Sequence, residues 1–300
     1  MSFWSIVEQS YGIKIRDSRP FHDVYKVRTE NGVYCLKPYE FHAEDVQFIG
    51  RILGYLEERG FSRGPKVYPT VEQAAFMTHN GVFYMLTNWV KGDRPDFSKR
   101  MDYKKGIRTL AKFHAVAEGF PLEEVPAGRV RYSGLSSEVT EYKELLSSYT
   151  HTGHLVPLCE EALGRLQQAG SLEAIDTEAQ LSAFTHGDYN YPNMIKDPHR
   201  KIHLIDFDNS SLHVRMKDLS HILHRNCLWD GTEMLRWIDY YHKHRSLSSG
   251  DRCLLHALLV APYHVVRNIR IGGIRHAKRV IPSQARMQKY QRELSVLSGS

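Results

Sequence analysis

The sequence predicts a two-lobed α+β fold, in which a small lobe built on an antiparallel sheet precedes a larger, mostly helical lobe. Strand-like runs separated by Asn-Gly turns fill the first ninety residues, helical periodicity dominates the rest, and a turn-rich segment at residues 91–95 lies between them. With 300 residues, 42% of them hydrophobic, the chain is long enough to bury a substantial core.

The small lobe is expected over residues 1–90. Its predicted elements are a short amphipathic helix at Phe3–Tyr11, strands at Val24–Thr29 and Val33–Lys37, a helix from Val46 to Gly60, and strands at Ala74–Thr78 and Val82–Thr87. Each strand pair is joined by Asn-Gly, the strongest short-range signal for a β-hairpin. The helix repeats apolar residues at intervals of three and four, which is the spacing of one helix face.

The helical lobe is expected over residues 91–300, after a hinge at about residues 85–92. Its predicted helices are Asp102–Glu118, Glu138–Ser148, Leu158–Ala169, Cys253–Ile271 and Ser283–Leu297, and helices are also expected through most of Lys217–Arg245. Two short strands, Met194–Lys196 and Ile202–Asp206, flank a turn at residues 197–200. This turn is expected to bring the polar residues on either side of it together.

Composition excludes several classes of protein. Charged residues at 25% and aromatic residues at 11% are ordinary globular values, which disfavours disorder and fibres. The four cysteines form no C-x-x-C pair, which disfavours a disulfide scaffold or zinc finger and is typical of a reducing compartment. The longest apolar-rich stretch, Leu254–Val266, is too short to span a bilayer, and the N-terminus lacks the pattern of a signal peptide. We therefore expect a cytoplasmic protein without a membrane partner.

The net charge is +6, from 40 Lys and Arg against 34 Asp and Glu. The excess lies in the C-terminal helices, where a solvated helix face explains it most simply. No interleaved surface aromatics or nucleic-acid-binding motif accompany it, so no nucleic-acid partner is expected.

Residues suited to phosphoryl transfer cluster between Phe184 and Leu223. This chemistry needs a carboxylate that orients the attacking hydroxyl, oxygen ligands for Mg²⁺ and a cation beside the phosphates. Asp188 suits the first role. Asn193 and Asp206 suit the second, with Asp208 as an extra ligand, and Lys37 on a predicted strand suits the third.

At these residues the sequence resembles the aminoglycoside phosphotransferase/choline kinase branch of the protein-kinase-like fold. That branch carries H-G-D-x-x-x-x-N and I-D-[FWY]-[DE], which match residues 186–193 and 205–208. Asp218-Leu219 resembles its D-L motif, whose Asp braces the catalytic loop. The resemblance implies a kinase-like fold that uses ATP and Mg²⁺. It assigns His186 to the catalytic loop beside Asp188, and adenine to the hinge at Leu86, Asn88 and Trp89.

A narrower resemblance points to the kinase-like spore coat proteins of the S and I group of endospore-forming bacteria. It rests on Val24–Tyr39, the hinge and Ile205–Leu223, and it implies a location in the spore coat with other coat proteins as partners.

Two features of the sequence depart from the pattern of a kinase. The first hairpin, residues 16–23, contains no glycine to approach phosphates. The helix partner of Lys37 stays open between Glu44 and Asp45.

The leading interpretation is an ATP- and Mg²⁺-dependent phosphotransferase that acts on a hydroxyl of a small molecule. The basic C-terminal helices, which carry His256, His264, Arg267 and Arg270, favour a neutral or anionic acceptor such as a sugar or a phosphorylated sugar. The alternative is a non-catalytic, kinase-like structural protein of the spore coat.

Overall fold

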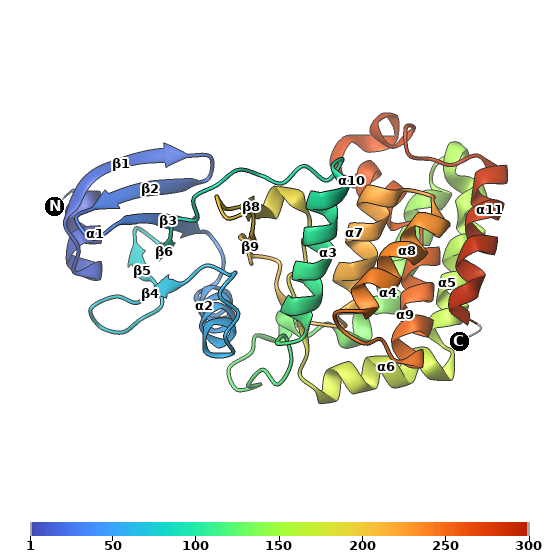
Figure 1. The fold of residues 1–300 in the computed structure, drawn as a ribbon, viewed down its shortest axis with the longest axis horizontal. Coiled ribbons are helices and arrows are strands. Elements are labelled where there is room, and N and C mark those ends of the chain that lie inside the picture. Colours follow the sequence, from blue (N-terminus) through green and yellow to red (C-terminus); the bar gives the residue numbers. More distant parts are fainter. Residues whose placement is uncertain (1, 299–300) are drawn as a thin grey trace. The chain divides into compact units, whose positions relative to one another are not determined.

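The computed structural model describes residues 2–298, which divide into two compact units (Figure 1). Unit 1 comprises Met1–Pro95, Phe120–Arg129 and Tyr191–Asp208, and unit 2 comprises Asp96–Gly119, Val130–Asn190 and Asn209–Ser300. The segment 191–208 therefore packs with the sheet rather than with the helices that surround it in sequence. Asp93 forms a β-bridge to Lys196, and the Leu204 N–H donates to the Arg63 carbonyl at 2.7 Å, which anchors this segment to unit 1.

Unit 1 is built on one antiparallel sheet with the strand order β1-β2-β3-β6-β4, and β5 also pairs with β6 (Figure 1). Its strands are β1 (Ile15–Phe21), β2 (Val24–Thr29), β3 (Val33–Tyr39), β4 (Val67–Tyr68), β5 (Met77–His79) and β6 (Val82–Asn88). Its helices are α1 (Phe3–Tyr11) and α2 (Ala43–Glu58), and a separate hairpin joins β8 (Met194–Lys196) to β9 (Ile202–Leu204).

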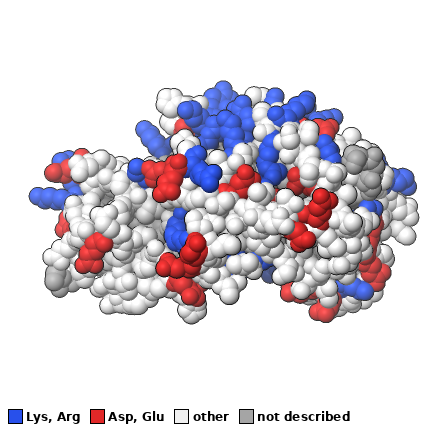
Figure 2. All heavy atoms as spheres, turned by 90° about the horizontal axis from the view of Figure 1, so that it is seen from below, with Lys and Arg blue, Asp and Glu red and all other residues white. Residues whose placement is uncertain are grey.

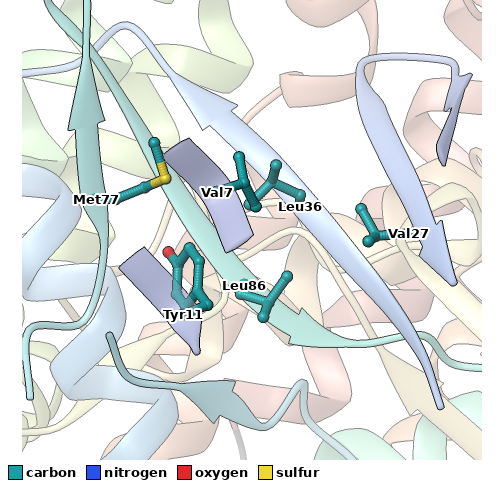
Figure 3. Packing of buried hydrophobic residues seen from close by; sticks show 6 residues of the cluster. All are labelled: Val7, Tyr11, Val27, Leu36, Met77 and Leu86. Atoms are coloured by element: carbon teal, nitrogen blue, oxygen red, sulfur yellow. The ribbon is translucent and has the colours of Figure 1, made fainter. Parts of the chain in front are cut away.

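The core of this sheet lies under α1. Val7 and Tyr11 of α1 pack on buried side chains of the strands, which Figure 3 shows as Val27, Leu36, Met77 and Leu86. The Tyr11 hydroxyl donates to the Tyr84 carbonyl at 2.5 Å and so satisfies its polar end within the apolar cluster. On the other face, Gly50 of α2 lies close to the Met85 side chain, so the two helices cover opposite faces.

Most predicted elements of unit 1 are confirmed, with three corrections. The strand β1 was not predicted, because its sequence IRDSRPF is polar and only its backbone pairing with β2 makes it a strand. The two-residue strand β4 is too short to leave a pattern. The strand expected at Ala74–Thr78 is limited to β5, which begins at Met77.

Unit 2 is predominantly helical. Its helices are α3 (Arg100–His114), α4 (Leu135–Ser147), α5 (Val156–Leu166), α6 (Ala169–Gln180), α7 (Met216–Cys227), α8 (Gly231–His242), α9 (Ser249–Val260), α10 (Tyr263–Ala277) and α11 (Gln284–Leu294). Its short strands β7 (Phe184–Thr185) and β10 (Ser211–Leu212) pair with each other and flank the polar segment of interest. Short 3₁₀ turns join several of these elements.

The helical predictions need two corrections in unit 2. The helix expected at Cys253–Ile271 is two helices, because Pro262 cannot donate the backbone hydrogen bond that would continue α9. The helix α6 was not predicted. The α+β class, with an antiparallel sheet and a larger helical part, is confirmed.

The surface charge is uneven, as the composition predicts. Figure 2 shows Lys and Arg side chains gathered along the upper edge of one face, while Asp and Glu are scattered across it. Within residues 2–298, no helix is both long and apolar enough to cross a membrane.

Candidate active site

Lys37 on β3 meets both acidic residues of the I-D-F-D motif within unit 1. Its Nζ lies 2.6 Å from Asp206 Oδ1 and 2.7 Å from Asp208 Oδ1. Burial disfavours the ammonium, but the two carboxylates outweigh this effect and raise the pKa of Lys37. Residues almost 170 positions apart thus form one charged cluster, with Lys37 in its charged state.

The β8–β9 hairpin places Asn193 beside this cluster. The Ile205 N–H donates to the Asn193 carbonyl at 3.0 Å, which continues the hairpin pairing and sets Asn193 next to Asp206 in the fold. Asp206 adopts φ +66°, a left-handed conformation that an L-residue rarely takes and that often marks a functional turn. Burial raises the pKa of Asp208 to about 6, although the Lys37 ammonium opposes this effect.

The predicted metal ligands suit Mg²⁺ by donor type, because they offer carboxylate and amide oxygens. No group of three His, Cys, Asp or Glu side chains able to hold a metal ion occurs within residues 2–298. The two acids and Asn193 therefore form a partial ligand set. Mg²⁺ commonly completes such a set with phosphate oxygens and water.

The helix α2 does not supply the partner of Lys37, so neither of the two expected acids takes that place. Asp45 instead accepts a hydrogen bond from Arg129 Nε at 2.6 Å, and Arg129 Nη1 donates to the Asp208 carbonyl at 2.6 Å. Glu44 is exposed. Arg129 thus links α2 to the acidic segment from a 3₁₀ turn (Ala127–Arg129) that carries no sequence signal.

The predicted adenine-binding residues lie at the end of β6, with several groups already engaged. The Leu86 side chain is buried in the α1 cluster. The Asn88 N–H donates to the Lys66 carbonyl, and the Trp89 N–H donates to the Val33 carbonyl, both at 3.1 Å. The Trp89 side chain is partly buried, with the Phe21 ring centre 5.2 Å and the Lys26 ammonium 4.4 Å from the centre of its ring.

In unit 2, Asp218 holds the His186–Asp188 segment by its backbone. The N–H groups of His186 and Gly187 donate to the two oxygens of Asp218 at 2.8 and 3.0 Å. Burial raises the pKa of this fully buried carboxyl, and the hydrogen bonds oppose that effect. The expectation that Asp218 braces this segment is confirmed.

Gly187 is required at the centre of the segment. It has φ +82°, and a Cβ there would lie 2.1 Å from the Asn209 carbonyl oxygen. Any other residue at this position would push the backbone at residue 187 away from the backbone at Asn209.

Asp188 carries an ion pair that the sequence does not signal. Arg225 on α7 donates to Asp188 Oδ1 from Nη1 at 2.6 Å, and the Arg225 side chain is only 8% exposed. The Asp188 N–H lies 3.4 Å from His186 Nδ1, so the histidine ring stays within the same turn. The Asp188 carboxyl is 36% exposed and lies at the surface of a cavity.

That cavity has a volume of about 330 Å³ and lies wholly within unit 2. Its lining includes Asp188, Glu138, Tyr263, Arg267 and Arg270. Of the four basic-helix residues singled out in the sequence, Arg267 and Arg270 line it, whereas His256 and His264 do not.

Solved structures of phosphotransferases share this fold. An aminoglycoside phosphotransferase from Alicyclobacillus acidocaldarius is 17% identical with a TM-score of 0.74, over 100% of this chain and 92% of the other. A spectinomycin phosphotransferase in complex with ADP and spectinomycin is 16% identical with a TM-score of 0.60, over 99% and 96%. An amicoumacin kinase in complex with AMP-PNP, Ca²⁺ and Ami is 15% identical with a TM-score of 0.62, over 99% and 92%.

A family model supplies the stronger link, since it matches sequence rather than fold. The model described as the phosphotransferase enzyme family matches residues 19–254, which is more than half of the chain. The matched range contains Lys37, Asp188, Asn193 and Asp206. The chain therefore belongs to the phosphotransferase enzyme family.

Proposed function

We propose that this protein transfers the γ-phosphoryl group of Mg²⁺-ATP to a hydroxyl of a small molecule. The observation that carries the proposal is the cluster of Lys37 with Asp206 and Asp208, next to Asn193. Partly buried charges cost free energy unless they are well paired. A nucleotide-metal site needs all of them.

Each residue has a distinct proposed role. Asp188 accepts the proton of the attacking hydroxyl, whose oxygen bonds to the γ-phosphorus as ADP leaves. Asn193, Asp206 and Asp208 hold Mg²⁺, and Lys37 contacts the phosphates once the metal takes the carboxylates. His186 supports the turn that carries Asp188, and the Trp89 side of the hinge receives adenine.

The cavity beside Asp188 is the proposed acceptor pocket. The Arg267 guanidinium forms no ion pair or hydrogen bond within residues 2–298, and Arg270 pairs with Glu141 at exposed positions. An unpaired guanidinium disfavours cationic acceptors. We therefore propose a neutral or anionic hydroxylated acceptor, such as a sugar or a phosphorylated sugar.

The narrower resemblance supports a place among kinase-like spore coat proteins. The sequence Ile205–Leu223 carries both the I-D-F-D motif and the R-x-x-D-L turn of that group. On this proposal, the protein works in the spore coat beside other coat proteins.

A second candidate is a coat protein that keeps the fold without turnover. The ion pairs of Lys37 with Asp206 and Asp208 favour this second candidate. A lysine paired in this way cannot contact phosphates unless a metal ion binds the two carboxylates instead. The two candidates differ in whether Mg²⁺ and ATP bind together.

Calorimetric titration with Mg²⁺-ATP separates these candidates, with Asp206→Asn as the test variant and the exposed Asp239→Asn as a matched control. The kinase proposal expects binding that needs Mg²⁺, that is lost in Asp206→Asn and that persists in the control. Absence of binding at millimolar ATP would overturn it and favour the structural candidate.

A further inference from the structure

The two faces of the unit 1 sheet differ in chemistry. Residues in register on neighbouring strands share a face, and so do residues two apart on one strand. Arg19 pairs with Lys26, and Lys26 pairs with Cys35, which is two residues before Lys37. Arg19, Lys26 and Lys37 therefore lie on the same face of the sheet.

The opposite face is apolar. Val27, Leu36 and Leu86 point to α1, where they pack around Val7 and Tyr11 (Figure 3). Because strand residues alternate between faces, this packing fixes the direction of the basic side chains. A one-residue slip would place Lys26 in the core, so the apolar cluster holds the register.

Arg19 and Lys26 lie directly opposite each other on β1 and β2, an arrangement of like charges that destabilises a sheet. Neither forms an ion pair within residues 2–298. Lowering of the pKa of Lys26, by desolvation first and then by Arg19, Arg28 and Lys91, agrees with an uncompensated positive field. An anion bound on this face would relieve the repulsion.

Lys26 also lies between the positions proposed for the two ends of the nucleotide, which are the hinge for adenine and Lys37 for the phosphates. The Lys26 ammonium is 4.4 Å from the centre of the Trp89 ring, at the hinge. Lys26 and Lys37 occupy diagonal positions on adjacent strands, roughly 8 Å apart at the backbone. A polyphosphate that runs from the hinge toward Lys37 would pass beside Lys26.

The turn between β1 and β2 offers few backbone N–H groups that could donate hydrogen bonds to phosphates. Phe21 pairs with Val24 across a two-residue turn at His22-Asp23, and Pro20 has no N–H to donate. A glycine loop binds phosphate through its N–H groups, but this tight hairpin uses its backbone for strand pairing. Side chains must supply the contacts instead.

We infer that Arg19 and Lys26 form a side-chain clamp for the polyphosphate of the nucleotide, in place of a glycine-rich loop. This inference rests on the proposed function, because it concerns the same nucleotide site. The guanidinium of Arg19 suits two phosphate oxygens at once, and the Lys26 ammonium supplies a point charge over Trp89.

The decisive experiment compares Mg²⁺-ATP with adenosine by calorimetry, for the wild type, Arg19→Gln and Lys26→Gln. Arg16→Gln is the matched control, since Arg16 lies on the same strand and pairs with Glu30 at the exposed surface. The affinity for Mg²⁺-ATP is expected to fall about tenfold in each clamp variant, because each variant loses one charge-assisted hydrogen bond to the polyphosphate. Arg19→Gln should leave the affinity for adenosine unchanged.

Thermal unfolding of the same variants excludes a structural explanation. Removing one of two repelling charges should leave the melting temperature unchanged or raise it, while the affinity for ATP falls. If ATP binds the wild type and both clamp variants equally, the inference is overturned and the proposed function stands.

A titration with sodium tripolyphosphate keeps the two ideas distinguishable. If Mg²⁺-ATP does not bind the wild type, the proposed function fails. Tripolyphosphate that binds the wild type but not Arg19→Gln would then still support an anion clamp, whereas equal or absent binding in both would overturn it.

Discussion

The segments His186–Asp188 and Asp206–Asp208 hold their carboxylates in different ways. In unit 2, the backbone of the first segment donates to the fully buried Asp218, which fixes the turn without using the Asp188 side chain. In unit 1, the carboxylates of the second segment are held by the ammonium of Lys37. A backbone scaffold keeps its geometry when ligands change, but an ion pair can be exchanged for a metal ion.

The largest expected effect separates chemistry from nucleotide binding. Asp188→Asn should lower the rate of phosphoryl transfer about 1,000-fold, equal to about 4 kcal/mol, because it removes the group that takes the hydroxyl proton. Its affinity for Mg²⁺-ATP should stay within about twofold of the wild type, since Asp188 is not among the proposed metal ligands. Steady-state kinetics together with calorimetry measures both. A variant that loses ATP affinity but keeps its rate would reverse the assigned roles.

Asp218→Ala should be the most destabilising substitution of the site. It leaves the N–H groups of His186 and Gly187 unsatisfied in the interior, at a cost of about 4 kcal/mol. Urea unfolding of this variant, beside Asp206→Asn, provides the comparison. Asp206→Asn should cost less, because the Asp206 side chain is 36% exposed. Equal losses of unfolding free energy in Asp218→Ala and Asp206→Asn would mean that both segments serve mainly to hold the fold.

As the pH falls, unit 2 should lose folding stability before unit 1 does. Burial lowers the pKa of His224, His256 and His264 to about 4, whereas none of the histidines of unit 1 is buried. Unfolded histidines take up protons near pH 6.5, so between about pH 6.5 and 4 the unfolded state binds more protons. Stability is therefore full above about pH 6.5 and lost as the pH falls through this window.

Roughly 6 kcal/mol should be lost at about pH 5, which is about 2 kcal/mol for each of these three histidines. Hydrogen exchange at about pH 7 and pH 5 checks this unit by unit. Faster exchange in the unit 1 sheet, without a change in α7 and α9, would contradict the prediction.

The smallest expected effect concerns Arg129. Arg129→Lys keeps the positive charge but cannot bridge Asp45 and the Asp208 carbonyl, so unit 1 should lose about 1 kcal/mol. If this bridge positions Asp208, the variant should also bind Mg²⁺-ATP more weakly. Calorimetry beside Arg131→Lys tests this, and unchanged affinity in Arg129→Lys would limit its role to stability.

The sequence by itself determined the fold class and predicted the chemistry of the site. Helical periodicity, Asn-Gly turns and the spacing of Asp188, Asn193 and Asp206 are local patterns, and each depends on residues close together in the chain. The β8–β9 hairpin and the bracing role of Asp218 follow from such patterns and are confirmed. The roles of the predicted ligands remain predictions.

Only the tertiary structure decided the partners of these residues. Asp45 meets Arg129, Asp188 meets Arg225, and Lys37 meets two aspartates, across separations of 37 to 171 positions. Charge complementarity allows many such pairs in a chain with 40 basic and 34 acidic residues. Packing selects among them, because a buried charge is tolerated only where the fold brings a partner within hydrogen-bond distance.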